Sequence, residues 1–160
     1  RLSVVTTKTR MYTMPLLEHF EIAQFFEIVT GRENVQNPKP HPEPILITLE
    51  QMNYDKDLHD VWMIGDTKLD LIAANEANVN SVGVLCGYGE KEELLQYTKY
   101  VKNNSLDAVN FINNFWLTIV NIKKIKNHLI HLRMAWWLNV QSSQVVNGQA
   151  LSAAVLQREY

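Results

Sequence analysis

Residues 61–70 read Val61-Trp62-Met63-Ile64-Gly65-Asp66-Thr67-Lys68-Leu69-Asp70, and this stretch decides the predicted fold. The apolar run predicts a buried strand, Gly65 a turn, and two aspartates follow four positions apart. If a helix begins at Thr67, Asp66 is its N-cap and Asp70 lies one turn further along. Both carboxylates can then face the carboxyl end of the strand, the edge at which open α/β sheets bind ligands. Paired carboxylates at that edge suit Mg²⁺.

The same segment also has a purely structural interpretation. Aspartate is a common N-cap, and an aspartate in the first turn complements the helix dipole. A strand followed by Gly-Asp and a helix therefore occurs in many folds. The segment alone leaves the metal site and the structural alternative at even weight, and the remainder of the chain has to decide between them.

The composition limits the possible classes of protein. The chain has 160 residues, 46% of them hydrophobic, which is enough for one core. A net charge of −2 gives no electrostatic argument for a nucleic-acid or anionic-membrane partner. The single cysteine, Cys86, excludes an internal disulfide and suits a reducing compartment. No apolar run reaches the roughly 20 residues of a membrane-spanning helix. The expected location is the cytoplasm.

Strand-like and helix-like segments alternate along the chain, which predicts an α/β fold with a parallel sheet flanked by helices. The expected strands are residues 2–6, 25–29, 61–64, 80–85 and 100–101, and the expected helices are residues 9–20, 45–52, 67–77, 90–96 and 106–112. The first helix should bury Met14, Leu16, Leu17 and Phe20, and the second Ile45, Leu46, Leu49 and Met52. Because proline restricts its own φ and the preceding residue, residues 38–44 should be a rigid, extended loop.

Four polar residues are expected at one edge of this sheet. Thr6 ends the first strand, Lys39 lies in the proline-rich loop, and Asp66 and Asp70 follow the later strand. A hydroxyl, an ammonium and two carboxylates around one crevice describe a phosphate and Mg²⁺ site. Taken singly, Thr6 is a common type of turn residue and Lys39 a common type of solvated loop lysine. In combination and in this order, the site is the better interpretation.

The sequence resembles the haloacid dehalogenase superfamily of phosphatases, in particular its phosphoglycolate phosphatase-like branch. The resemblance covers residues 1–112. It rests on Val4-Val5-Thr6-Thr7-Lys8, Lys39-Pro40-His41-Pro42-Glu43-Pro44, Gly65-Asp66-Thr67-Lys68-Leu69-Asp70, Ala73-Ala74-Asn75-Glu76-Ala77 and Val84-Leu85-Cys86-Gly87-Tyr88-Gly89. Cys86 stands where a larger residue is usual in that branch.

The resemblance implies a role for each matching residue. Thr6, with Thr7, would bind phosphoryl oxygens, and Lys39 would orient the nucleophile and balance charge on the aspartyl-phosphate intermediate. Asp66 would bind Mg²⁺ directly, and Asp70 directly or through water. The implied reaction is Mg²⁺-dependent hydrolysis of a small phosphorylated metabolite through an aspartyl-phosphate, which splits one difficult step into two.

One departure from the family pattern is important. The family's nucleophile belongs to an Asp-x-Asp signature on a strand that precedes all of these motifs, and only five residues precede Thr6. The spacing occurs only at Asp55 and Asp57, in a polar loop unsuited to that role. The cap domain is missing as well. We therefore expect a C-terminal fragment of a phosphatase, inactive alone, with unpaired strand edges and low stability.

Residues 113–160 lie outside the resemblance and differ in charge. They carry 5 Lys and Arg against 1 acidic residue, whereas residues 1–112 carry 10 against 16. Residues 115–138 are hydrophobic and basic with partial helical period, so we expect a mostly helical, amphipathic extension. Such a helix can dock onto a partner, onto its own domain or onto a membrane surface, and a non-native extension is weighed ahead of the membrane alternative. His128 and His131 lack a nearby third ligand, which argues against a metal site.

Two other functions compete with the phosphatase hypothesis. A truncated, non-catalytic relative could bind Mg²⁺ or phosphate weakly or act through its basic tail. A receiver-like phosphoacceptor also combines clustered aspartates with a lysine on an α/β sheet. In receivers the acidic cluster precedes the lysine, whereas here Lys39 precedes Asp66, so the receiver alternative is disfavoured.

Overall fold

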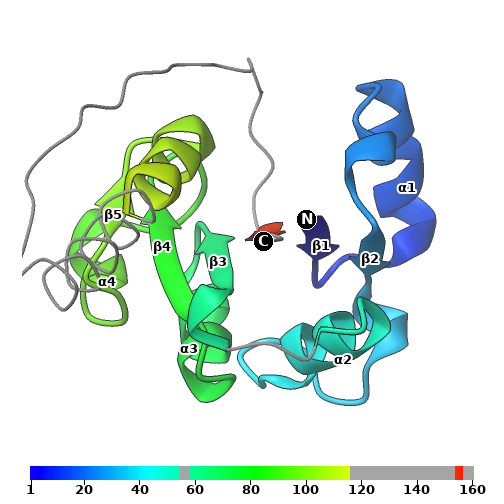
Figure 1. Cartoon of the computed structure of the whole chain (residues 1–160), viewed down its shortest axis with the longest axis horizontal. Helices are drawn as coiled ribbons and strands as arrows, with labels where there is room; N and C mark the ends of the chain where they lie inside the picture. Colours follow the sequence, from blue (N-terminus) through cyan, green and yellow to red (C-terminus); the bar gives the residue numbers. More distant parts are fainter. Residues whose placement is uncertain (55–57, 116–153, 157–160) are drawn as a thin grey trace, which may run out of the picture.

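The computed structural model describes residues 1–54, 58–115 and 154–156, and its centre is a six-stranded sheet in the order β2-β1-β6-β3-β4-β5. The strands are β1 (Leu2–Val5), β2 (Ile28–Thr30), β3 (Trp62–Gly65), β4 (Asn80–Val84), β5 (Val101–Lys102) and β6 (Ala154–Leu156). The pairs β1–β2, β3–β4 and β4–β5 are parallel. Figure 1 shows the two groups of strands, with β6 in red between β1 and β3.

Helices alternate with these strands, which confirms the predicted α/β class. The helices are α1 (Arg10–His19), α2 (Glu43–Gln51), α3 (Lys68–Glu76) and α4 (Lys91–Leu94), with 3-10 turns η1 (Ala23–Phe25), η2 (Arg32–Asn34) and η3 (Leu58–Asp60). Residues 105–115 are also helical. The predicted elements are therefore present, with ends that differ by a few residues.

Both faces of the sheet are covered, because successive strand residues point to opposite sides. On one face, Val5 and Met63 pack with Ile45 and Leu49 of α2 and with Ala73 of α3. The opposite face has two smaller clusters. One joins Trp62, Ile64, Val82 and Val84 to Ala108 and Ile112 of the last helix, and the other joins Val4 and Val29 to Leu17 of α1.

Several predicted helix faces are wrong in detail. Leu17 is buried as expected, but Leu16 and Phe20 of the same stretch are 46% and 54% exposed. In α2, Leu46 is 43% exposed while Ile45 and Leu49 are buried. In both helices the buried stripe is therefore narrower than the apolar pattern predicts.

The proline-rich segment is not the extended loop that the sequence predicts. Lys39 and Pro40 form a turn with a cis peptide bond, and the N–H of His41 donates to the carbonyl of Pro38 at 3.0 Å. Pro42 is helical in backbone conformation, and Pro44 lies in the first turn of α2. Proline is tolerated there because the first N–H groups of a helix have no intrahelical partner.

The expected unpaired edges of β1 and β3 are also not observed, because β6 pairs with both. Ser3 and Met63 are each opposite Val155, in antiparallel register. This strand corrects two expectations: the sheet is not wholly parallel, and the C-terminal extension contains a strand.

Other expectations for the extension concern residues outside the described ranges. These are the amphipathic helix within residues 116–153 and the pair His128 and His131. The alternative Asp55 and Asp57 pair also lies outside those ranges. Among the helices that are described, none has the length and apolarity needed to cross a membrane.

Candidate functional site

The carboxyl ends of β1 and β3 lie at the same edge of the sheet, as their common register with β6 requires. Thr6 follows β1, and its N–H donates to the carbonyl of Thr30 at 3.0 Å, which fixes the strand end against β2. The Thr6 hydroxyl accepts from the N–H of Lys8 at 3.1 Å. Thr6 is half-buried, whereas Thr7 is exposed. This tight turn presents backbone and hydroxyl groups at the sheet edge.

Lys39 connects the two groups of strands. Its ammonium Nζ donates to the carbonyl of Val5 at 3.0 Å and to Oδ1 of Asp70 at 2.5 Å. The side chains of Lys39 and Asp70 are only 6% and 3% exposed. A buried lysine with these partners is not a solvated loop lysine, which was the structural alternative for this residue. It ties the end of β1 to the beginning of α3.

Asp70 is engaged through both of its carboxylate oxygens. Oδ1 accepts from Lys39, and Oδ2 accepts from the N–H and the hydroxyl of Thr67 at 3.1 and 2.9 Å. Its side chain lies over Gly65, where an added Cβ would overlap the Asp70 side chain. Only glycine therefore fits at position 65. The sequence shows a glycine after the strand, and the structure gives the reason for it, which is the side chain of Asp70.

The helix start differs by one residue from the prediction. Thr67 is the N-cap and α3 begins at Lys68, so Asp66 precedes the cap. Asp70 at the third helical position reaches back to the Thr67 N–H, as in a capping box. The shift releases Asp66 from a capping role and leaves its side chain available for another one.

Asp66 is held differently from Asp70. It is 7% exposed, its Oδ2 accepts from the N–H of Tyr88 at 3.0 Å, and its carbonyl accepts from the N–H of Gly89 at 2.8 Å. Within the described part of the chain, no donor hydrogen-bonds its Oδ1. Asp66 is thus the carboxylate with free coordinating capacity.

The charges at this edge do not cancel. Lys39 balances Asp70, and the buried carboxylate of Asp66 has no cationic partner among the described residues. Burying an uncompensated carboxylate is unfavourable unless a cation accompanies it. Over the same described ranges, no three His, Cys, Asp or Glu side chains cluster as a metal site. One or two carboxylates with open positions fit Mg²⁺, which keeps several waters and binds phosphate oxygens.

Three contributors to the site were not predicted from the sequence. The Val5 carbonyl could not be, because any residue offers one. Thr67 could have been identified from its spacing of three to Asp70, but the usual capping box has Glu or Gln at that position. The sequence predicts Gly87, Tyr88 and Gly89 as a turn and as part of the family resemblance but not as a contact of Asp66, although two closely spaced glycines indicate a close backbone approach.

These observations define a class of protein, an α/β protein with a lysine and paired aspartates at the carboxyl edge of its sheet. The family profile described as haloacid dehalogenase-like hydrolase matches residues 1–84. The chain therefore belongs to the haloacid dehalogenase-like hydrolase family.

Several curated relatives that match this chain are phosphoglycolate phosphatases. The phosphoglycolate phosphatase of Escherichia coli strain K12 is 40% identical over 97 residues, covering 59% of this chain and 38% of the relative. That of Colwellia psychrerythraea is 36% identical over 97 residues, covering 61% of this chain and 42% of the relative. The chain thus spans about two fifths of the length of these relatives.

Solved structures agree with the fold. A predicted phosphatase from Clostridium acetobutylicum superimposes with a TM-score of 0.60 at 28% identity, covering 69% of this chain and 50% of the other. A haloacid dehalogenase-superfamily hydrolase of subfamily IA, from Geobacter sulfurreducens, gives a TM-score of 0.55 at 25% identity, with 69% and 47% covered.

Proposed function

We propose that residues 1–112 form the phosphate-binding and metal-binding side of a Mg²⁺-dependent phosphatase that acts on small phosphorylated metabolites in the cytoplasm. The main support is the bridge made by Lys39, which hydrogen-bonds both the end of β1 and Asp70. Motifs that lie 30 or more positions apart in the sequence thereby meet at one edge of the sheet. The curated relatives suggest phosphoglycolate or a similar phosphomonoester as the substrate class.

Each residue has a chemical task in this proposal. The hydroxyl of Thr6 and the amides of the following turn hold phosphoryl oxygens, with Thr7 at the rim. Lys39 balances negative charge near the reacting phosphorus and keeps its ammonium fixed, because two acceptors already orient it. Bound Mg²⁺ would supply electrostatic stabilisation of charge on the phosphoryl oxygens.

The two aspartates have unequal tasks. Asp66 is the direct Mg²⁺ ligand, because its Oδ1 accepts no hydrogen bond from the described residues. Both oxygens of Asp70 already accept hydrogen bonds, from Lys39 and Thr67. We therefore assign Asp70 a supporting task, in which it orients Lys39 and reaches the metal through water.

Turnover needs a nucleophilic carboxylate beside Thr6. The Asp-x-Asp spacing occurs only at Asp55 and Asp57, and these residues lie outside the described ranges. We propose that the nucleophile belongs to the full-length parent and not to these 160 residues. The 160-residue polypeptide should then bind Mg²⁺ and phosphate but form no aspartyl-phosphate.

A non-catalytic binding protein is the second candidate, and the same missing Asp-x-Asp favours it. It would use Asp66 and Thr6 to bind Mg²⁺ and phosphate without chemistry. Joining the 160 residues to an upstream segment with Asp-x-Asp, if the gene encodes one, separates the two candidates. Mg²⁺-dependent hydrolysis of phosphoglycolate supports the phosphatase, and binding without hydrolysis supports the alternative.

The first test is a Mg²⁺ titration of the 160-residue protein by isothermal calorimetry, with Asp66→Asn and Asp107→Asn as matched variants. Asp107 forms its hydrogen bonds with Asn104, away from this site. The proposal predicts that Asp66→Asn abolishes Mg²⁺ binding and Asp107→Asn does not. Equal binding by Asp66→Asn and the unchanged protein would contradict the site assignment.

A further inference from the structure

The backbone of the loop after β4 lies directly against Asp66. It contributes two backbone donors, the N–H of Tyr88 to Oδ2 and the N–H of Gly89 to the Asp66 carbonyl, at 3.0 and 2.8 Å. Its beginning is fixed to β5, because the N–H of Leu85 donates to the carbonyl of Lys102 at 3.0 Å. The loop is therefore fixed to β5 at its beginning and hydrogen-bonds Asp66 at its end.

Both glycines of this loop are required by space. A Cβ added at Gly87 would overlap Oδ2, Cβ and Cγ of Asp66. A Cβ at Gly89 would overlap the Asp66 carbonyl oxygen and lie 2.8 Å from Cδ2 of Leu94. Neither glycine has a positive φ, so backbone conformation does not explain their presence.

The side chain of Tyr88, between the two glycines, does not take part in these hydrogen bonds. Tyr88 is 92% exposed, whereas its backbone N–H is the donor to Asp66. The donor therefore depends on how closely the backbone approaches, and not on the tyrosine ring.

We propose that Gly87, with the backbone amide of Tyr88, is a positioning element that fixes the carboxylate of Asp66 for a divalent cation. Oδ2 is held by the loop, and Oδ1 would remain available to bind the cation. Outer-sphere groups that orient a metal ligand are typically worth about 10–100-fold in metal affinity. This inference rests on the proposed function, because it takes Asp66 as the Mg²⁺ ligand.

The test is a Mg²⁺ titration of the 160-residue protein followed by ¹⁵N NMR, with Gly87→Ala, Gly83→Ala and Tyr88→Ala. Gly83→Ala is the control for backbone crowding, since its Cβ would lie 3.2 Å from Cδ1 of Leu94 and away from Asp66. We expect Gly87→Ala to weaken Mg²⁺ binding by about 10-fold or more. Gly83→Ala and Tyr88→Ala should retain the affinity, and Mg²⁺ should shift the amide signal of residue 88 in both.

Thermal melting of each variant separates loss of the site from loss of the fold. If Gly87→Ala melts no lower than Gly83→Ala and binds Mg²⁺ as tightly, the positioning inference is overturned and the proposed function stands. If the unchanged protein takes up no Mg²⁺, both are overturned. If Gly83→Ala weakened Mg²⁺ binding to the same extent, the inference would also be overturned. Crowding anywhere in the sheet would then be enough to lower the Mg²⁺ affinity.

Discussion

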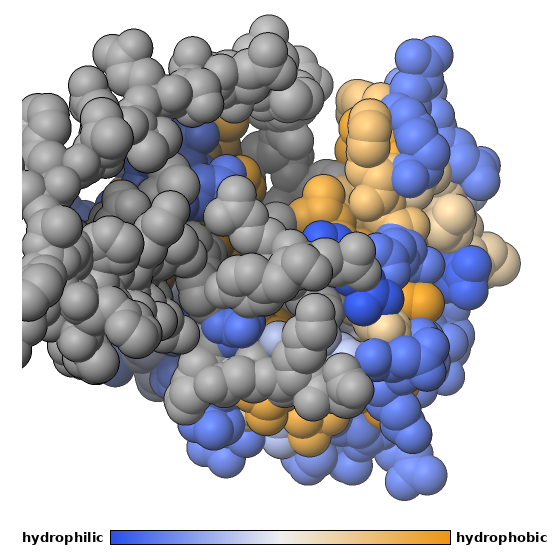
Figure 2. Space-filling model, in the orientation of Figure 1, coloured by the Kyte–Doolittle hydropathy of each residue, from blue (hydrophilic) through white to orange (hydrophobic). Residues whose placement is uncertain are grey.

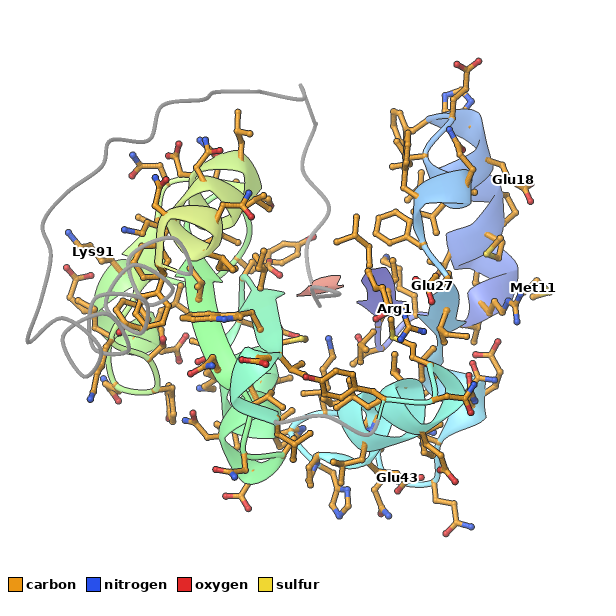
Figure 3. All side chains as sticks on the ribbon, viewed as in Figure 1. Arg1, Met11, Glu18, Glu27, Glu43 and Lys91 are labelled. Carbon is orange, nitrogen blue, oxygen red and sulfur yellow. The ribbon has the colours of Figure 1, made fainter. Side chains whose placement is uncertain are left out.

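The two groups of strands on either side of β6 differ in how completely their large apolar side chains are buried. The metal side (β3, β4, β5 and α3) fully buries Trp62, Met63 and Val82, and its exposed apolar side chains include Leu69 of α3 and Tyr88 of the loop after β4. The phosphate side (β1, β2, α1 and α2) shares the core of Val5, Ile45 and Leu49 with the metal side. It adds only a small cluster around Leu17 and exposes several large apolar side chains, namely Met11, Tyr12, Leu16, Phe20 and Phe25. Figure 2 shows apolar residues among polar ones over α1 and η1, and Met11 projects outward in Figure 3.

The two sides of the site are fixed by different kinds of contact. On the metal side, Asp66 and Asp70 are fixed by a buried strand, a helix cap and the loop after β4. On the phosphate side, Thr6 depends on its short strand, on β6 and on the bridge from Lys39 to Val5. Exposed contacts such as the Arg1–Glu27 pair, at 2.8 Å, contribute little (Figure 3). Breaking the Lys39 bridge should therefore disturb the phosphate side most.

The largest expected effect comes from Lys39→Met, which leaves Asp70 buried without its cation. Removing one partner of a buried ion pair costs about 3–5 kcal/mol in the free energy of unfolding. Urea unfolding followed by circular dichroism measures it. Adding Asp70→Asn to Lys39→Met should restore part of the loss, because no uncompensated charge then remains.

The matched control for this substitution is Lys68→Met. Lys68 pairs with Glu93 at 2.8 Å, but their side chains are 48% and 39% exposed. Water screens such a pair, so the midpoint of urea unfolding should not change measurably. Equal losses for Lys39→Met and Lys68→Met would show that the Lys39 bridge does not join the two sides.

Trp62→Ala tests the closed core of the metal side. Trp62 is fully buried against the rings of Tyr100, Phe111 and Phe115, and its removal should cost about 3–5 kcal/mol in the free energy of unfolding. Leu17→Ala on the phosphate side should cost less, near the lower end of about 2–5 kcal/mol, because Met14, Ile22 and Phe26, which pack against its cluster, are only partly buried and can close the cavity. Thermal denaturation compares the two, and a larger loss for Leu17→Ala would reverse the contrast.

Thr67→Val has a smaller effect. It removes the hydroxyl that donates to Oδ2 of Asp70 at 2.9 Å and keeps the N–H that donates to the same atom. We expect a loss of about 1–2 kcal/mol in the free energy of unfolding. Chemical denaturation measures this loss, and an unchanged midpoint would mean that the backbone N–H alone orients Asp70.

The smallest expected effect is a pH dependence on the phosphate side. The N–H of Gln36, followed by the Asn37 side chain, lowers the pKa of the Glu43 carboxyl below its ordinary 4.5. A lowered pKa means that the folded state favours the carboxylate. Its stabilisation is complete above about pH 4.5 and is lost as the pH falls through the lowered value. Glu43→Gln should flatten the stability curve in that acidic range only, as thermal melts between pH 2.5 and about 6 would reveal.

Much of the fold could be predicted because its signals are local. The apolar run before Gly65 and the spacing of Asp66 and Asp70 predict the strand, the turn and the helix that the structure contains. Thr6 could be assigned to the same edge as Asp66 because parallel strands end together, whereas Lys39 follows no strand directly and is assigned there by the combination of motifs. Their contacts depend on pairing across the sheet and could not be derived from spacing.

The misplaced and missed elements have physical reasons. β6 is three residues of ordinary apolar sequence, and its pairing depends on a gap between β1 and β3 that no local pattern encodes. The exposed Leu16 and Phe20 follow the apolar period of a helix whose sheet is too narrow to cover them. Pro42 and Pro44 were expected in an extended loop, but proline is equally compatible with a first helical turn.

The measurement that tests the central claim most directly is a calorimetric Mg²⁺ titration with and without inorganic phosphate. If the two sides form one site, phosphate should tighten Mg²⁺ binding by about 5-fold or more, and Mg²⁺ should tighten phosphate binding by the same factor. Thr6→Val should remove this coupling and leave Mg²⁺ binding alone intact. Independent binding of Mg²⁺ and phosphate would contradict the account, because the two sides would then be separate surfaces.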